Sequence, residues 1–164
     1  MDLVILHLGS NMDDRLGFLV QAVSLIEENI GKVLKKSSIY ETDAWGVDGQ
    51  DDYLNQSITL STKLDPKQLL KSAQAIEVQM GRQKEKQWGS RVIDIDILAY
   101  GFKTIKTESL TIPHPLLSQR NFVLVPLMEI EPYLVLPGFE LNIEELYEQC
   151  KDNCDVWLYD ETSN

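Results

Sequence analysis

The sequence is short of positive charge, of cysteine and of long apolar runs. Lys and Arg number 15 against 26 Asp and Glu, and the net charge of −11 argues against a broad binding surface for nucleic acid or anionic membranes. No apolar run is long enough to span a membrane, and the opening stretch MDLVILHLGSN is too short and too acidic for a signal peptide. We therefore expect a cytoplasmic protein that binds neither nucleic acid nor membranes.

Cysteine is limited to Cys150 and Cys154, which lie four residues apart in a predicted helix. They have no Cys or His partners at zinc-ligand spacing, so we expect a structural or incidental role in a reducing compartment.

The usual phosphate-binding and nucleophile motifs are also missing. The chain has no G-x-x-x-x-G-K-[ST], no G-x-G-x-x-G and no serine in a G-x-S-x-G setting. The stretch Gly9-Ser10-Asn11 fits a turn followed by a helix cap better than it fits a phosphate loop. His7 lies inside a predicted strand, where we favour a packed core residue over a ligand.

The chain does contain enough apolar residues for one folded domain, which we place over residues 1–164. Apolar runs and alternation predict strands over 3–8, 32–40, 53–62 and 92–98, and a hairpin over 101–112. Helices are predicted from Asn11 or Asp13 to Gly31, from Asp65-Pro66 to Gly81, and over 143–150. The order strand, helix, strand, strand, helix, strand is the split β-α-β pattern. It predicts an α+β fold: a ferredoxin-like βαββαβ core with an added hairpin and C-terminal helices, in a single α/β/α domain.

The stretch SRVIDIDILAYG places Asp94 and Asp96 on one face of a predicted strand, roughly 6.6 Å apart. Two aspartates on a solvent-facing surface are the simplest interpretation. However, the preceding loop gathers four cations with one acid in an otherwise acidic chain: Arg82, Lys84, Lys86 and Arg91. Carboxylates at this spacing suit two Mg²⁺ ions across a polyphosphate, and arginines suit the phosphate oxygens that the metals leave free.

A second candidate group combines Tyr53 and Asn55, two apart on a strand, with Phe122. Ordinary sheet packing would explain these residues. Alternatively, the two aromatic rings sandwich a flat heterocycle while the amide of Asn55 reads its edge.

These residues lie in segments through which the chain resembles the 6-hydroxymethyl-7,8-dihydropterin pyrophosphokinase family along nearly its full length. The segments are LGSN, SSIYET, DDYLNQ, IEVQMGR, WGSRVIDIDIL, LTIPHP and RNFVLVPLMEI. The specific signature is W-G-x-R-x-x-D-x-D followed by two hydrophobic residues. The resemblance implies an enzyme of folate biosynthesis that transfers pyrophosphate from ATP to the pterin hydroxymethyl group and releases AMP.

The resemblance also implies roles for individual residues. Asp94 and Asp96 would ligate two Mg²⁺ ions. On chemical grounds apart from the resemblance, Asp96 is also a candidate acceptor of the hydroxyl proton, although metal binding would lower its basicity. Arg82 and Arg91 would stabilise the migrating pyrophosphoryl group. The other residues implied to contact ATP are Gln74, Glu77, Trp88, Ile97, His114 and Arg120. Those implied to hold the pterin are Thr42, Tyr53, Asn55 and Phe122. The partners are two small molecules, ATP and 6-hydroxymethyl-7,8-dihydropterin, and we expect a monomer.

The chain departs from the family pattern at two places. Gln87 stands where a basic residue usually precedes the signature tryptophan, which leaves one phosphate contact open. The loop after Thr42 runs Asp43-Ala44-Trp45-Gly46, without the proline that often precedes its glycine. Neither departure removes a proposed metal ligand.

Two other functions fit parts of the same pattern. A nucleotidyltransferase on this fold would also use D-x-D but would release pyrophosphate. A non-catalytic module would bind a small ligand without turnover, and it would leave the clustered arginines and aspartates without a purpose.

Overall fold

The computed structural model describes residues 2–43, 52–81 and 92–160. Its centre is an antiparallel sheet in which β1 (Asp2–Ser10) lies between β4 (Tyr53–Thr62) and β5 (Asp94–Tyr100). On its other side β4 pairs with both β2 (Gly31–Lys36) and β3 (Tyr40–Thr42), and β3 pairs with β8 (Val156–Leu158). A hairpin of β6 (Ile105–Lys106) and β7 (Thr111–Ile112) follows β5.

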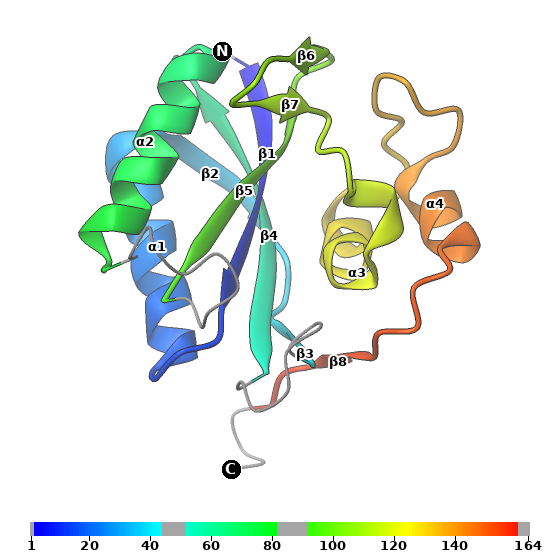
Figure 1. Cartoon of the computed structure of the whole chain (residues 1–164), viewed down its shortest axis with the longest axis horizontal. Coiled ribbons are helices and arrows are strands. Elements are labelled where there is room, and N and C mark those ends of the chain that lie inside the picture. The colour runs from blue at the N-terminus through cyan, green and yellow to red at the C-terminus, as the bar shows by residue number, and fades with distance from the viewer. Residues whose placement is uncertain (1, 44–51, 82–91, 161–164) are drawn as a thin grey trace.

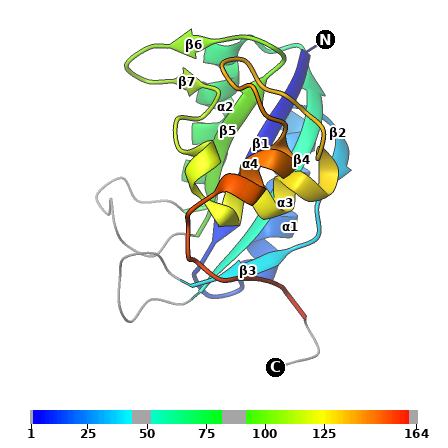
Figure 2. The same cartoon turned by 90° about the vertical axis from the view of Figure 1, so that its right-hand side faces the viewer.

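Helices cover both faces of this sheet (Figures 1 and 2). On one face lie α1 (Arg15–Asn29) and α2 (Pro66–Gln79), the latter beginning at an Asp65 capping box with proline in its first turn. On the other face lie α3 (Asn121–Ile130), preceded by the short 3₁₀ helix η1 (Leu117–Gln119), and α4 (Ile143–Gln149). The result is the α/β/α arrangement with a βαββαβ core that the sequence predicts. No helix in the described ranges is long and apolar enough to cross a membrane.

The alternation along β5 separates two cores. Ile93, Ile95 and Ile97 pack in the core beneath α1 and α2, as predicted. Leu98 and Ala99 both belong to the core beneath α3 and α4, because the register between β1 and β5 shifts there. Asp94 and Asp96 therefore lie on the face covered by α3 and α4, beyond the edge of its apolar core.

Several predicted boundaries were wrong. Asp14, rather than Asn11 or Asp13, caps α1. The strand predicted over 32–40 is two strands, because the backbone leaves β2 at Ser37 and rejoins β4 only at Tyr40. The last helix ends at Gln149, so Cys150 is its C-cap and Cys154 lies outside it; both thiols are free.

At two helix ends the backbone geometry favours or requires glycine. Gly81 follows α2 with a φ of +104°, which favours glycine. Gly31 begins β2 directly after α1, and a Cβ there would lie 2.0 Å from the carbonyl oxygen of Ser61. Thus Gly31 permits a close strand contact instead of a left-handed helix end.

Candidate active site

The site begins with the register of β1 against its two neighbours. Gly9 lies opposite both Asn55 on β4 and Asp94 on β5, whereas His7 lies opposite both Ser57 and Asp96. Directly opposed residues share a face, so the two aspartates and Asn55 flank β1 on the face that carries α3 and α4. The sheet brings together the candidate metal ligands and a candidate pterin residue from two different strands.

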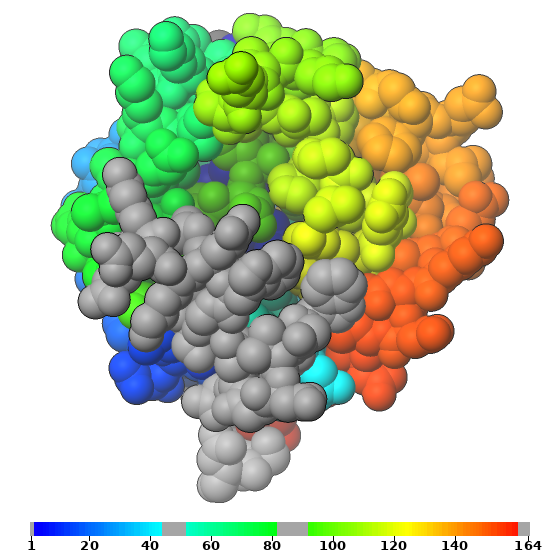
Figure 3. Space-filling view, viewed as in Figure 1, coloured from blue at the N-terminus to red at the C-terminus, as the bar shows by residue number. Residues whose placement is uncertain are grey.

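A recess in the surface reaches β5 and β1. Figure 3 shows atoms of β5 and β1 at depth between α2, the β6–β7 hairpin and the start of α3. Asp94 and Asp96 are both half-buried, and each has an interaction partner. Because Gly9 has no side chain, it leaves the space next to Asp94 open; a Cβ there would meet Tyr53 and Asn55 only at ordinary contact distances of 3.6 and 3.7 Å.

The donor set at the two aspartates fits a hard cation. Among the residues that the structure describes, no cluster of three or more His, Cys, Asp or Glu side chains could hold a metal by itself. Two carboxylates on one strand face supply hard oxygen ligands and leave other coordination positions for water and phosphate oxygens. That arrangement suits Mg²⁺ and is unlike a structural zinc site.

A chain of polar side chains occupies the neighbouring part of the same face. Asn55 is 2% exposed, and its Nδ2 donates to Thr42 Oγ1 on β3 at 3.0 Å. Its Oδ1 lies 3.3 Å from His7 Nε2, and His7 Nδ1 lies 3.3 Å from Ser57 Oγ. Three side chains, Thr42 on β3, His7 on β1 and Ser57 on β4, therefore fix the position of the Asn55 amide.

Two side chains at the start of α3, the aromatic Phe122 and the cationic Arg120, cover this row of hydrogen-bonded side chains. The Phe122 ring lies 5.9 Å from the His7 ring, tilted by 53°, and the Arg120 guanidinium lies 5.4 Å from the Phe122 ring centre. Burial lowers the pKa of His7 to about 4, and the positive charge of Arg120 acts in the same direction. His7 is therefore a neutral ring at neutral pH.

His114 approaches β5 from the segment after β7. A cis peptide bond joins Ile112 to Pro113, and the His114 backbone N–H donates to the Leu98 carbonyl at 3.0 Å. His114 Nδ1 accepts the Leu116 N–H at 3.2 Å. Burial and the charge of Arg120 lower the pKa of His114. The neutral ring consequently carries its proton on Nε2, where it can donate to a ligand oxygen or nitrogen.

Comparison with known proteins assigns this arrangement to a family. The model of the 7,8-dihydro-6-hydroxymethylpterin-pyrophosphokinase family matches residues 5–132, a range that contains every candidate site residue. The chain belongs to this family.

Relatives within the pyrophosphokinase family cover most of the chain. It is 39% identical over 145 residues to 2-amino-4-hydroxy-6-hydroxymethyldihydropteridine pyrophosphokinase of Aquifex aeolicus, covering 88% of this chain and 90% of that protein. The Bacillus subtilis protein of the same name is 46% identical over 124 residues, covering 75% of this chain and 74% of its own length. A crystal structure of Plasmodium falciparum HPPK-DHPS with pteroate aligns with a TM-score of 0.74 at 17% identity. It covers 90% of this chain but only 42% of that longer chain, so it supports the fold alone.

The other candidate nucleotide contacts of this pyrophosphokinase family member lie along α2 and β5. Glu77 is 4% exposed, and its carboxylate accepts the Ile95 N–H at 3.2 Å, which ties α2 to the outer edge of β5. Gln74 is exposed one turn earlier on α2. The Ile97 side chain is buried on the face opposite Asp94 and Asp96. Since strand residues two apart orient their backbone alike, Ile97 presents backbone groups to the edge where Ile95 meets Glu77.

Three of the candidates, Arg82, Trp88 and Arg91, lie outside the described residues, as do Lys84, Lys86, Gln87 and Trp45. Their roles stay predictions. Of the candidates that are described, the fold gathers Asp94, Asp96, Asn55, Tyr53 and Thr42 on one sheet face, with Phe122, Arg120 and His114 beside it.

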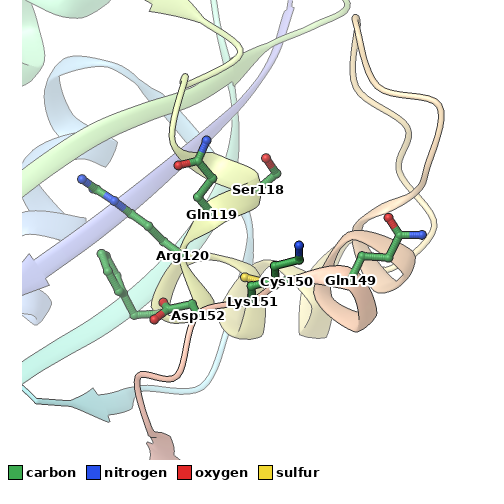
Figure 4. A pocket seen from close by; sticks show the side chains of 8 residues that line it. Ser118, Gln119, Arg120, Gln149, Cys150, Lys151 and Asp152 are labelled. Carbon is green, nitrogen blue, oxygen red and sulfur yellow. The ribbon is translucent and has the colours of Figure 1, made fainter.

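A hollow of about 470 Å³ adjoins this group between the start of α3 and the end of α4. Its lining consists of Ser118, Gln119, Arg120, Phe122, Gln149, Cys150, Lys151 and Asp152. Figure 4 shows the Arg120 side chain extending away from Gln149 and Cys150. The Asp152 carboxylate already accepts the N–H groups of Asn121 and Cys154, so it serves to hold the C-terminal segment against α3.

The polar contacts of His7 are the part of the site that the sequence does not predict. His7 is buried, as predicted, but it joins Ser57 to Asn55 and touches Phe122. The available signal was a histidine two residues before Gly9 on a strand of otherwise apolar residues. Its significance depends on the pairing register, which the sequence pattern does not specify.

Proposed function

We propose that the protein transfers pyrophosphate from ATP to 6-hydroxymethyl-7,8-dihydropterin, a step of folate biosynthesis. The products are AMP and 6-hydroxymethyl-7,8-dihydropterin pyrophosphate. The observation that carries the proposal is that β1 separates Asp94 and Asp96 from Asn55 by a single strand. A polyphosphate bound at the aspartates and a heterocycle bound at Asn55 would adjoin each other over Gly9.

The aspartates form the metal half of the proposed site. Asp94 and Asp96 would hold two Mg²⁺ ions together with phosphate oxygens and water. Bound Mg²⁺ would neutralise the charge of the polyphosphate oxygens. The two carboxylates, half-buried on one strand face, would fix where the triphosphate lies relative to β1.

The nucleotide half would run along β5 toward α2 and the segment after β7. His114 Nε2–H and the Arg120 guanidinium supply donors that suit phosphate or base atoms. Glu77 and the backbone of Ile97 lie at the outer edge of β5, and Gln74 is exposed one turn earlier on α2; all three would contact the rest of the nucleotide. Arg82, Arg91 and Trp88 complete the proposed nucleotide contacts on the grounds of their positions in the family signature.

The pterin half would lie over Gly9 and Asn55. Tyr53 shares a sheet face with Asn55, and the Phe122 ring lies 5.9 Å from the His7 ring. A flat ring between Tyr53 and Phe122 would stack on both and place its edge at Asn55 and Thr42. Gly9 matters here because any larger side chain would occupy the floor of this space.

The reaction itself depends on positioning more than on covalent chemistry. The pterin hydroxymethyl oxygen forms a bond to the β-phosphorus while the bond from that phosphorus to the α-phosphate bridging oxygen breaks, so AMP leaves. Asp96 is the candidate acceptor of the hydroxyl proton, although bound Mg²⁺ would lower its basicity. Arg82 and Arg91 would stabilise the charge that develops on the transferred group.

The direct test is to incubate the purified protein with ATP, Mg²⁺ and 6-hydroxymethyl-7,8-dihydropterin and to separate the nucleotides. We expect AMP and pterin pyrophosphate in equal amounts, and neither product when the pterin or Mg²⁺ is omitted. Formation of ADP, or release of free pyrophosphate in step with an adenylated pterin, would contradict the proposed reaction.

A further inference from the structure

His7 is a buried polar residue in the middle of β1, which pairs with both β4 and β5. It is 3% exposed, between Ile5, which packs in the core under α3 and α4, and Gly9 on the same face. Both of its ring nitrogens lie within hydrogen-bond distance of a side-chain oxygen, Ser57 Oγ and Asn55 Oδ1. An apolar residue would fill this position more simply, because every buried polar group requires a partner.

The direction of these hydrogen bonds follows from the contact between Asn55 and Thr42. Asn55 Nδ2 donates to Thr42 Oγ1, so the amide oxygen is the atom that faces His7. An amide oxygen can only accept, so His7 Nε2 carries the proton. In the neutral ring Nδ1 is then an acceptor, and the Ser57 hydroxyl donates to it. The Ser57 hydroxyl thus satisfies Nδ1, while the Nε2–H of His7 holds the oxygen of the Asn55 amide in place.

We propose that His7 is a positioning residue that fixes which way the Asn55 amide faces the bound heterocycle. In this orientation the second Nδ2 hydrogen and the second lone pair of Oδ1 stay available to a ligand. They match a ring edge that offers one acceptor beside one donor, as the amide-like edge of a 4-oxopterin does. The inference rests on the proposed function, since it assigns Asn55 to the pterin.

The His7 ring also lies next to Phe122, another residue of the pterin half. Phe122 lies 5.9 Å from His7, so the histidine also limits how far the Phe122 ring can settle toward the sheet. A rotated Asn55 amide would place a donor where the ligand donates and an acceptor where it accepts. Loss of one good hydrogen bond to a buried partner weakens binding by about tenfold.

Four variants separate positioning from simple space filling. His7→Leu introduces an apolar side chain of similar size and removes both hydrogen bonds. His7→Gln keeps an N–H that can donate to Asn55. Ser57→Ala leaves the ring in place and removes the hydrogen bond to its Nδ1. Thr59→Val is the matched control, because the Thr59 hydroxyl is buried two residues along β4 and has no hydrogen-bond partner.

The measurement is the affinity of each full-length variant for 6-hydroxymethylpterin and, separately, for a non-hydrolysable ATP analogue with Mg²⁺, by calorimetric titration. We expect His7→Leu to weaken pterin binding about tenfold and Ser57→Ala about threefold, with the affinity for the ATP analogue within about twofold of wild type. We expect His7→Gln to recover most of the loss and Thr59→Val to bind as wild type does.

A double variant gives the decisive comparison. In an Asn55→Ala background, His7→Leu should cause no further loss of pterin affinity, because the amide that it orients is gone. The inference would be overturned if His7→Leu lowered pterin affinity equally in both backgrounds, or if neither His7→Leu nor Ser57→Ala changed pterin binding. In either case, AMP production by the wild type would still support the proposed function. No pterin binding by the wild-type chain would overturn both.

Discussion

Asp94 and Asp96 share one face of β5, where the proposed Mg²⁺ ions would bind. Asp96→Ala should therefore lower kcat by about a thousandfold or more, since it removes several kcal/mol of charge stabilisation. In EDTA, the melting temperature of Asp96→Ala should equal that of the wild type or be slightly higher. Rates of AMP formation and thermal melts of the same preparations test both expectations.

The matched control for that change is Glu108→Ala, which removes an exposed acid from the hairpin between β6 and β7. It lowers the negative charge of the chain by the same amount without touching β5. If Asp96→Ala turned over at a rate close to that of Glu108→Ala, the assignment of Asp96 to the metal would be wrong.

His7 also makes a prediction about pH. Its pKa falls from 6.5 to about 4 on folding, chiefly through burial. Between these two values the unfolded chain binds a proton that the folded chain excludes, so stability falls as the pH decreases from 6.5 to 4. The shift corresponds to roughly 3 kcal/mol of unfolding free energy. Urea unfolding at several pH values should show this loss in the wild type.

His7→Gln provides the comparison, because glutamine cannot take up a proton in this range. Between pH 6.5 and pH 4, the unfolding free energy of His7→Gln should fall by roughly 3 kcal/mol less than that of the wild type. Carboxylates titrate over the same range in both proteins, so only the difference between the two curves reports on His7. Parallel curves would show that His7 is not excluded from protonation in the folded state.

At the level of secondary structure, β8 holds β3 in place. The Trp157 Nε1–H donates to Glu41 Oε1 at 3.0 Å, and Glu41 Oε2 pairs with Arg15 at 2.6 Å. Because β3 ends at Thr42, the residue that bonds Asn55, we expect Trp157→Ala to raise the KM for pterin about threefold to tenfold and leave the KM for ATP unchanged. Hydrogen exchange of the amides of Tyr40 to Thr42 should become faster.

Tyr147→Ala is the appropriate control for that experiment. Tyr147 lies on α4 and is 38% exposed, the same fraction as Trp157, but it is remote from β3 in the strand pairing. Equal effects of the two alanine variants on exchange at Tyr40 to Thr42 would mean that β8 does not restrain β3.

β8 also shows which elements the sequence predicts and which it does not. The alternation in VIDIDIL predicted β5, its two faces and the placement of both aspartates, because period-two burial is a local signal. β8 has three half-buried or exposed residues and no such alternation, and it is a strand because β3 offers it an edge. The division of β2 from β3 likewise follows from how both pair with β4.

For the molecule as a whole, the same distinction applies to the site. Residue types and spacing indicated the metal half and the pterin half separately. What places them together is the register of β1 against β4 and β5, which puts Asn55 and Asp94 opposite one glycine. The polar contacts of His7 follow from that register too, so no local pattern could predict them. A pairing shift of one residue would move every one of these side chains to the other face.

The division of the site between neighbouring strands predicts how ligands stabilise the whole molecule. A non-hydrolysable ATP analogue should raise the melting temperature only when Mg²⁺ is present, because at the proposed site its phosphates would otherwise meet two carboxylates at β5. At about 100 times its dissociation constant a ligand adds about 2.7 kcal/mol, which corresponds to several degrees for a chain of this size. 6-Hydroxymethylpterin should then add a further increase, and Asp96→Ala should abolish the first increase. A full shift with the analogue in EDTA would place the nucleotide away from β5.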